Sequence, residues 1–263
     1  MYNIIDKNHS QIKSHSIWIK TLLKEANTRK YVFETTDEKR VETVCIQRKT
    51  GITACVSVQV GCPVRCIFCH SGRNGLIRNL TASEIVQQVT FLKEKINRIV
   101  FMGIGEPLFN YDALIKSIHI LRDRNGLDFP TSAITVSTVG PVKQLKKLRE
   151  EHLKIQLVLS LHATTQKTRD YIIPGMKGNN INQVVEAALS YAQRHRRKLV
   201  IAYLLLPGKN DSHSDIKQLT QWFKHENVMI NLLENNNANK INEKKAKKTL
   251  NCLKINLNIR DLR

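Results

Sequence analysis

Short apolar runs alternate with amphipathic stretches over most of this chain. The apolar runs have the length of buried strands, and the predicted strands are Arg98–Met102, Ala133–Val136, Ile155–Leu159, Leu199–Leu205, Val228–Leu232 and Ile255–Ile259. The stretches between them have helical spacing, and the predicted helices are Ala82–Lys95, Tyr111–Arg122, Val142–Glu151, Gln183–His195, Ser214–His225 and Lys244–Leu253. Strands that alternate with helices imply a parallel sheet with right-handed crossovers. The pattern therefore predicts an α/β fold, a partial (open) βα barrel of about six units that binds its substrate at the carboxyl ends of the strands.

The first part of the chain follows a different pattern. Apolar positions within Ser10–Ala26 have helical spacing and predict a short N-terminal helix. The runs Tyr31–Phe33 and Val41–Ile46 flank a polar segment and predict a β-hairpin, with Ala54–Val60 as a further strand. We therefore expect residues 1–50 to form an appendage of helix and hairpin, and residues 51–263 to form the core domain.

Composition adds a candidate partner and a compartment. Lysine and arginine number 42 against 22 aspartates and glutamates, a formal net charge of +20. This excess favours a nucleic acid, RNA or DNA, as a partner, although a codon bias toward Lys, Asn and Ile would produce the same excess. No apolar run approaches the roughly 18 residues that span a bilayer, and the first residues lack a signal-peptide core. Because three of the six cysteines are clustered, a reducing compartment fits better than secretion. We expect a cytoplasmic protein that does not associate with a membrane.

Three cysteines form the most specific motif in the chain. Cys62, Cys66 and Cys69 have a C-x3-C-x2-C spacing directly after an apolar run. Thiolates this close together suit an iron–sulfur cluster, and three ligands leave one iron of a four-iron cluster open for chemistry. A structural zinc ion is the alternative, but zinc favours a fourth ligand at a matching spacing, and His70 is adjacent to Cys69.

Polar residues also follow several predicted strands. Gly105 and Glu106 lie in a Gly-Ile-Gly-Glu-Pro segment after the first core strand, where glycines let the backbone approach a ligand. Candidate ligand contacts at later strand ends are Ser137, Ser160, Leu161, His162 and Asn236. Capping of strand ends is the alternative role for each motif alone.

The cysteine spacing resembles that of the radical S-adenosylmethionine enzymes. In these enzymes the open iron of a 4Fe-4S cluster binds S-adenosylmethionine, which is cleaved to a 5′-deoxyadenosyl radical, and a "GGEP" element holds the amino group of S-adenosylmethionine. The resemblance makes Cys62, Cys66 and Cys69 the cluster ligands and assigns the strand-end residues to the cofactor S-adenosylmethionine. It also implies an electron donor such as flavodoxin or ferredoxin.

A wider set of motifs is similar to one subgroup. Cys55 to Cys62 resembles its "CVSSQVGC" signature, and Glu42-Thr43-Val44 matches its "ETV" strand. Its "FMGMGEPL-N", "STSG", "SLHA" and "R–L-P" elements correspond to Phe101–Asn110, Ser137–Gly140, Ser160–Ala163 and Arg169 to Pro174. The subgroup is the RNA methyltransferases acting on adenine carbon 2 of 23S ribosomal RNA and some tRNAs, with carbon-8 resistance enzymes as sisters.

The resemblance implies roles for two further residues. Cys55 would resolve a covalent link between protein and RNA, and Glu42 would accept a proton. A lone cysteine on a strand is more often a packing residue.

The resemblance ends near the C-terminus. The family's methyl-carrying cysteine follows the last strand, whereas this sequence ends at Arg263, and Cys252 stands on the predicted last helix. The first interpretation is an RNA methyltransferase that acts on rRNA or tRNA. The alternatives are a radical enzyme of another reaction type without the methyl relay, or a truncated, non-catalytic homologue that binds RNA or cofactor.

Overall fold

The structure is a computed structural model, and it describes residues 17–233. The chain divides into two compact units. The first consists of Met1–Pro63 and Ser71–Val136, and the second of Val64–His70 and Ser137–Arg263. The predicted boundary at residue 50 stays a prediction.

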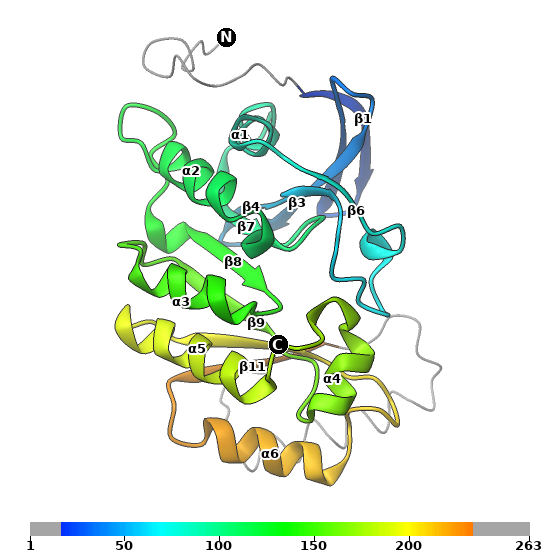
Figure 1. The fold of residues 1–263 in the computed structure, drawn as a ribbon. Helices are drawn as coiled ribbons and strands as arrows, with labels where there is room; N and C mark the ends of the chain where they lie inside the picture. The colour runs from blue at the N-terminus through cyan, green and yellow to red at the C-terminus, as the bar shows by residue number, and fades with distance from the viewer. Residues whose placement is uncertain (1–16, 234–263) are drawn as a thin grey trace. The chain divides into compact units, whose positions relative to one another are not determined.

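The first unit contains a mixed sheet with helices against it (Figure 1). Its strands are β1 (Ile17–Glu25), β2 (Thr28–Thr35), β3 (Arg40–Arg48), β4 (Gly51–Val56), β5 (Gln59–Gly61), β6 (Leu76–Asn79), β7 (Ile96–Phe101) and the beginning of β8 (Ile134–Thr138). Its α-helices are α1 (Ala82–Thr90) and α2 (Tyr111–Leu121). The strand order is β1-β2-β3-β4-β7-β8, antiparallel from β1 to β4 and parallel from β4 to β8. β5 and β6 form a separate antiparallel pair.

The predicted N-terminal helix is wrong over residues 17–25, because these residues form strand β1. A register shift between Ile19 and Thr21 explains the misleading spacing. Ile17 and Ile19 lie opposite Thr35 and Phe33, and beyond the shift Leu22 lies opposite Tyr31. The extra residue changes the alternation, so that apolar side chains on one face of a strand acquire helix-like intervals. Residues 10–16 of that prediction lie outside the described residues.

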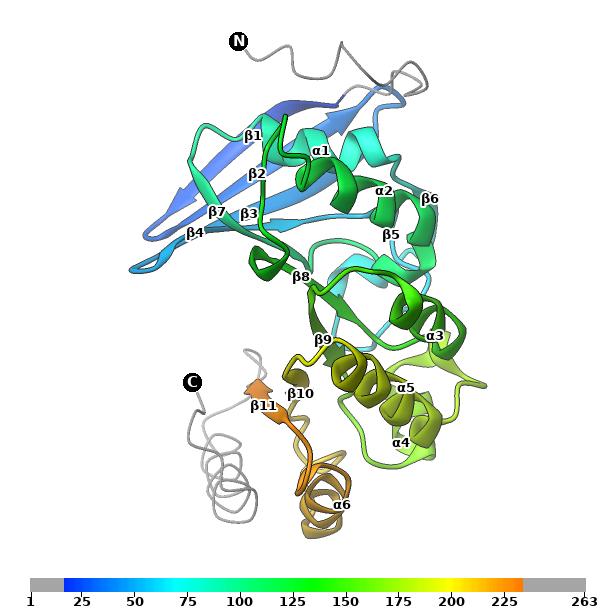
Figure 2. The same ribbon diagram turned by 90° about the vertical axis from the view of Figure 1, so that its left-hand side faces the viewer.

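The second unit contains three parallel strands and four helices in the described part of the chain. The strands are β9 (Gln156–Ser160), β10 (Leu199–Leu204) and β11 (Val228–Leu233), and β10 pairs with both others. The helices are α3 (Val142–Glu150), α4 (Gln166–Ile172), α5 (Ile181–Arg194) and α6 (His213–Phe223). α3 and α5 pack side by side, as Figure 2 shows. The hydroxyl of Tyr191 on α5 donates to the carbonyl oxygens of Leu153 and Ile155, and so ties the helix to the start of β9.

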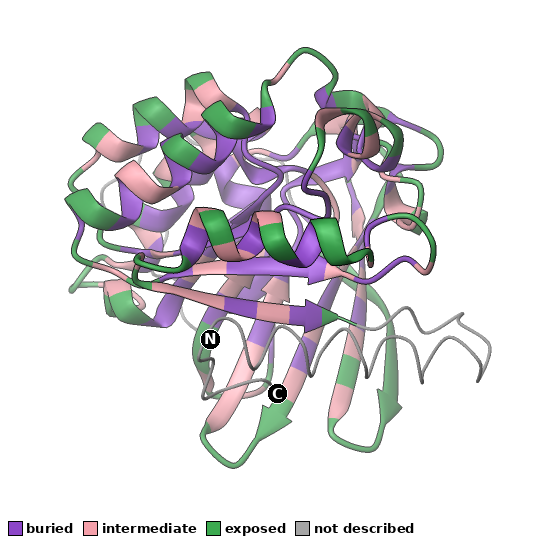
Figure 3. Cartoon of the chain, turned by 90° about the horizontal axis from the view of Figure 1, so that it is seen from below, coloured by how far each residue is buried: buried purple, intermediate pink, exposed green. Residues whose placement is uncertain are grey.

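Apolar side chains fill the space between each set of strands and its helices. Figure 3 shows the helices buried on one side and exposed on the other. In the first unit, Tyr31, Phe33 and Val56 are almost completely buried, as are Ile85 on α1 and Leu114 on α2. Burial of each such side chain contributes roughly 1.5–3 kcal/mol to folding.

The predicted hairpin and the alternation of strands and helices from residue 82 to residue 233 are confirmed. The predicted strand Ala54–Val60 is interrupted at Ser57 and Val58, which separate β4 from β5. Strand β6 and helix α4 were not predicted. The predicted elements Lys244–Leu253 and Ile255–Ile259 lie outside the described residues. Within residues 17–233, none of the helices combines the length and apolar character that crossing a membrane requires.

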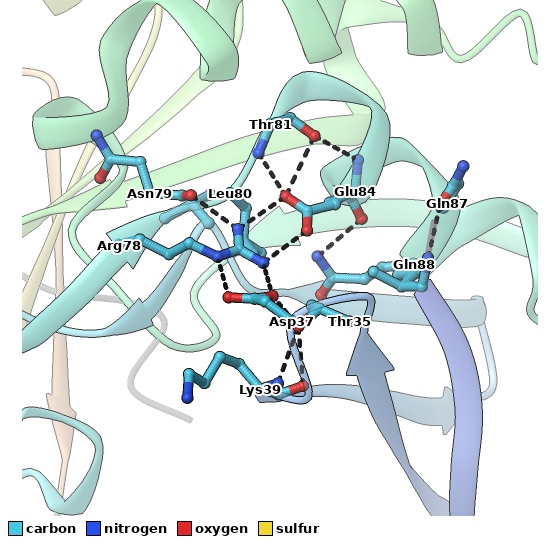
Figure 4. A network of polar contacts seen from close by, with 12 residues as sticks. Thr35, Asp37, Lys39, Arg78, Asn79, Leu80, Thr81, Glu84, Gln87 and Gln88 are labelled. Atoms are coloured by element: carbon cyan, nitrogen blue, oxygen red, sulfur yellow. Dashed lines mark hydrogen bonds and ion pairs between the residues drawn. The ribbon is translucent and has the colours of Figure 1, made fainter. Parts of the chain in front are cut away.

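A partly buried charge network joins the β2–β3 turn to β6 and α1 (Figure 4). Arg78 on β6 donates to both carboxylate oxygens of Glu84 at 3.0 and 2.8 Å, and to both of Asp37 at 2.9 and 2.6 Å. Glu84 is completely buried and also accepts from the backbone N–H of Thr81, completing a capping box at the start of α1. The Arg78 guanidinium lowers the pKa of Asp37 well below its usual range. The network fixes the hairpin turn to the first helix.

We expect Arg78→Met to lower the free energy of unfolding by about 3–5 kcal/mol, because it leaves the Glu84 carboxylate buried without its guanidinium. Asp37→Asn is the matched control, with an expected loss of about 1 kcal/mol or less because Asp37 is largely exposed. Urea denaturation of both variants measures the difference. Equal losses would contradict the importance of the buried half of the network.

Candidate functional site

The predicted site residues fall into two groups, one in each unit. The first unit contains Glu42, Cys55, Cys62, Gly105 and Glu106. The second contains Cys66, Cys69, Ser137, Ser160, Leu161 and His162. Asn236 lies outside the described residues.

Glu42 and Cys55 lie on the same face of the first sheet. Cys55 on β4 is opposite Val44 on β3, and Glu42 is two residues from Val44, so both side chains project to one side. Diagonal neighbours of this kind are roughly 7–8 Å apart. Lys30 on β2 forms an ion pair with the Glu42 carboxylate at 2.6 Å. The structure therefore brings together the two residues that were predicted from separate motifs.

Cys55 is a protonated thiol at neutral pH. Burial raises its pKa to about 11, opposed by a hydrogen bond with the backbone of Met102. Because the thiolate is the nucleophile, Cys55 has to lose a proton before it can attack. Cys45, on the opposite face of the sheet, also has its pKa raised by burial, to about 12. Cys55 thus differs from Cys45 in the face it occupies and in sharing that face with Glu42, whereas Cys45 lies near Glu94.

The loop Gly103–Pro107 is bound to the segment that links β4 to β5. Ser57 donates its hydroxyl to the Glu42 carbonyl oxygen at 2.5 Å and accepts from the Ile104 N–H at 2.9 Å. The Gly103 N–H donates to the Val56 carbonyl oxygen at 3.1 Å. A Cβ added at Gly103 would lie 2.7 Å from the Ser57 Oγ and 2.8 Å from its backbone nitrogen. The close approach of two backbones therefore explains the glycine.

Gln59 fixes the second half of the same loop. Its side-chain oxygen accepts from the Glu106 N–H at 2.9 Å, and its amide nitrogen donates to the Asn79 side chain at 2.8 Å. Gly105 has φ +108° and lies directly against Gln59. The Glu106 carboxylate accepts from the Leu108 N–H at 3.0 Å and is almost completely buried. Glu106 is thus held in one orientation at the end of β7.

The residues that hold this loop were not predicted from the sequence. Ser57 and Gln59 are completely buried, as is Gln88 on α1, whose amide group bonds the Ser57 backbone and the Thr43 hydroxyl. Asn110 donates to the carbonyl oxygens of Val58 and Leu80. The available signal was the interruption of the apolar run from Ala54 to Val60 by polar residues at alternate positions.

The cysteine loop passes from the first unit to the second. Cys62 is buried after β5, and its N–H donates to the Gly75 carbonyl oxygen at 2.9 Å. Cys66 and Cys69 are half-buried, and the Cys69 N–H donates to the Cys66 carbonyl oxygen at 3.0 Å, which closes a turn. Arg65 has φ +54°, a left-handed conformation uncommon outside glycine. The two later cysteines are thus presented by one tight turn.

Two strand ends meet in the second unit. The hydroxyl oxygens of Ser137, on β8, and Ser160, on β9, are 3.2 Å apart and share a hydrogen bond. His162 has φ +54° and is buried, and its ring meets the Phe68 ring edge-on with centroids 5.0 Å apart. Burial, followed by the charge of Arg169, lowers the pKa of His162 to about 3. The structure thus gathers Ser137, Ser160 and His162 near the Cys66–Cys69 turn.

Leu161 follows directly after Ser160 at the end of β9. Its side chain is completely buried, its N–H donates to the Ala202 carbonyl oxygen, and its own carbonyl oxygen accepts from Arg169. Contact of Leu161 with a ligand stays a prediction.

The donor set fits an iron–sulfur cluster by its chemistry. Among the described residues, no three His, Cys, Asp or Glu side chains are already grouped closely enough to hold a metal ion. The loop nevertheless offers three thiols and no carboxylate between Cys62 and Cys69, which is a ligand set for iron–sulfur rather than for a hard cation. Cys62, Cys66 and Cys69 are the residues that would hold the cluster.

We expect Gly105→Ala to distort the Glu106 loop, because the added Cβ would lie 2.7 Å from the Gln59 Cβ at a φ of +108°. The expected loss of stability is about 1–3 kcal/mol. Gly126→Ala is the matched control, since its Cβ would meet nothing closer than 3.5 Å. Thermal unfolding of the two variants measures the difference, and equal melting temperatures would contradict the close packing of this loop.

Comparisons with known proteins agree with these features. The family model described as "Radical SAM superfamily" matches residues 56–220. Proteins of this superfamily bind a 4Fe-4S cluster and S-adenosylmethionine, which confirms both predicted cofactors at the level of the family. The crystal structure of a radical SAM methyltransferase from Sphaerobacter thermophilus has a TM-score of 0.87 and 29% identity, and the match covers 97% of this chain and 79% of that one. This likeness confirms the predicted class, an α/β partial barrel.

Two curated relatives indicate which family within the superfamily the chain belongs to. A "Probable RNA methyltransferase" from Rhodopseudomonas palustris is 53% identical over 206 residues, which are 78% of this chain and 57% of the relative. A "Probable dual-specificity RNA methyltransferase RlmN" from Thermotoga maritima is 40% identical over 243 residues, which are 89% of this chain and 71% of the relative. The chain therefore spans between about half and three quarters of the length of the relatives it matches. On these matches, the chain belongs to the radical SAM superfamily and, within it, to the family of the RlmN-type RNA methyltransferases.

Proposed function

We propose that this protein is a radical S-adenosylmethionine enzyme that methylates an adenine carbon of ribosomal or transfer RNA. The observation that carries the proposal is the placement of Glu42 and Cys55 on one face of a sheet. β4, which bears Cys55, leads through β5 directly into the C-x3-C-x2-C loop. The names of the relatives support RNA as the substrate, and so does the net charge of +20.

The cofactor residues have separate tasks. Cys62, Cys66 and Cys69 would ligate the cluster, and Glu106 would accept hydrogen bonds from the amino group of S-adenosylmethionine. The Ser137 and Ser160 hydroxyls bond its polar groups. When bound, the cluster and S-adenosylmethionine together supply the means to abstract a hydrogen atom, which an unreactive aromatic C–H position needs.

The protein's own acid–base chemistry lies at Glu42 and Cys55. Cys55 starts as a thiol, because burial raises its pKa to about 11. Glu42, which is ion-paired with Lys30, accepts a proton on the same face. In this family the RNA is linked through a carbon atom to the sulfur of the methyl-carrying cysteine. The Cys55 thiolate would attack that sulfur and form a disulfide, while the sulfur–carbon bond breaks and its electron pair stays with the carbon on the RNA.

The partners follow from this chemistry. RNA would be bound by positive charge, and an electron donor such as flavodoxin or ferredoxin would be the second partner. A cofactor held by thiolates suits a reducing compartment, and we place the protein in the cytoplasm.

We expect the anaerobically reconstituted protein to convert S-adenosylmethionine to 5′-deoxyadenosine in the presence of a reductant. Cys62→Ala should lose the brown cluster absorbance and this activity, because one of three thiolate ligands is removed. Iron analysis, visible spectroscopy and chromatography measure these outcomes. A wild-type protein that binds iron but forms no 5′-deoxyadenosine would refute the radical function. Cleavage without any new methyladenosine in RNA would instead favour another reaction type.

We expect Cys55→Ala to retain wild-type iron content while the RNA product stays attached to the protein or does not form. Cys45→Ala is the matched control: it lies one strand away on the opposite face, and it should still release its RNA. Gel analysis of protein–RNA adducts and mass spectrometry of the RNA distinguish the two variants. Loss of the cluster in Cys55→Ala would show that the role assigned to Cys55 is wrong.

A further inference from the structure

The Cys66–Cys69 turn is held by one segment of the second unit. Helix α4 and the short 3-10 helix Pro174–Met176 follow each other in the chain, and we call Gln166–Met176 the strut. The Ile67 N–H donates to the Ile172 carbonyl oxygen at 3.0 Å, and the Gly175 N–H donates to the Val64 carbonyl oxygen at 2.8 Å. The strut thus bonds the backbone of the cysteine loop on both sides of Cys66.

The strut is in turn anchored by a buried guanidinium. Arg169 on α4 is 1% exposed and is the largest fully buried side chain. It donates to the carbonyl oxygen of Leu161 at 2.5 Å and to the carbonyl oxygen of Val139. These carbonyls lie one residue beyond Ser160 and two residues beyond Ser137, the hydroxyl pair at the ends of β9 and β8. One side chain therefore links the strut to both strand ends.

His162, just beyond β9, contacts the cysteine turn directly and not through the strut. Its Nδ1 accepts from the Leu204 N–H at 2.9 Å, so the proton of the neutral ring is on Nε2. Its carbonyl oxygen accepts from the Asn210 side chain at 2.8 Å. These bonds fix the ring that meets Phe68, which stands between Cys66 and Cys69.

We infer that Arg169 is a positioning residue: through the strut, it sets the Cys66–Cys69 turn against the strand ends that carry Ser137 and Ser160. This inference rests on the proposed function of the loop and extends it to a residue outside the predicted cluster ligands and cofactor contacts. The planar guanidinium reaches two carbonyls at once, whereas the ammonium of lysine is a point donor. Charge alone therefore does not replace arginine here.

The test compares Arg169→Lys and Arg169→Met with Lys167→Met, which removes an exposed charge from the same helix. We expect both Arg169 variants to lose iron to a chelator at least tenfold faster than wild type. We expect their KM for S-adenosylmethionine to rise at least tenfold, with kcat within about threefold. Lys167→Met should match wild type in all three quantities. Iron loss followed at the cluster absorbance is a readout that does not depend on turnover.

The outcomes separate this inference from the proposed function. If wild-type protein binds no cluster, the proposed function fails. The inference is overturned if the wild type binds a cluster but Arg169→Lys loses iron no faster than Lys167→Met and has the same KM for S-adenosylmethionine.

Hydrogen exchange of the wild-type protein tests the inference without a variant, should the Arg169 variants not fold. The amide of Ile173, bonded to the Arg169 carbonyl, and the amides of Ile67 and Gly175 should open as one unit. Exchange of the Ile67 amide tenfold or more ahead of the Ile173 amide would show that the strut does not hold the loop.

Discussion

The contact between the β4–β5 segment and the Gly103–Pro107 loop is the constraint on which the first unit depends. Ser57 and Gln59 bond the loop backbone, and glycines at 103 and 105 allow the approach. This segment lies within the stretch that runs from Cys55 on β4 to Cys62 after β5. Because one stretch of chain carries both cysteines and the loop contacts, a shift there would displace the proton chemistry, the cofactor loop and a cluster ligand together.

In the second unit, burial and the positive charge of Arg169 together determine the protonation state of the neighbouring His162. Arginine side chains stay protonated in folded proteins. The buried guanidinium of Arg169 is therefore stabilised by hydrogen bonds to carbonyl oxygens. A second cation beside it would be costly, and His162 is accordingly kept neutral by burial and by the charge of Arg169. The neutral ring accepts a backbone hydrogen bond that a charged ring could not.

The sequence predicts those parts of the fold that local periodicity determines. Helices such as α5 and strands such as β10 were predicted because the spacing of their apolar residues matches the positions that face the core. β1 was mistaken because a bulge changes the spacing in a way that only its pairing with β2 reveals. α4 has seven residues, too few to show a period. The motifs located most of the candidate site, but the buried partners Ser57 and Gln59 gain their roles from a loop more than forty residues away.

Strand β1 has a consequence for how this protein can be shortened or fused. Among residues 17–233 it is the edge strand of its sheet, and Trp18, Ile19, Leu22 and Leu23 are exposed along it. An open strand with apolar side chains is a template for pairing between molecules, and a bulge and lysines are two devices that discourage such pairing. Here the bulge and Lys20 coincide. A truncation that removed β1 would make the regular strand β2 the edge strand instead. Without a bulge, that edge would pair more readily with another molecule and favour aggregation.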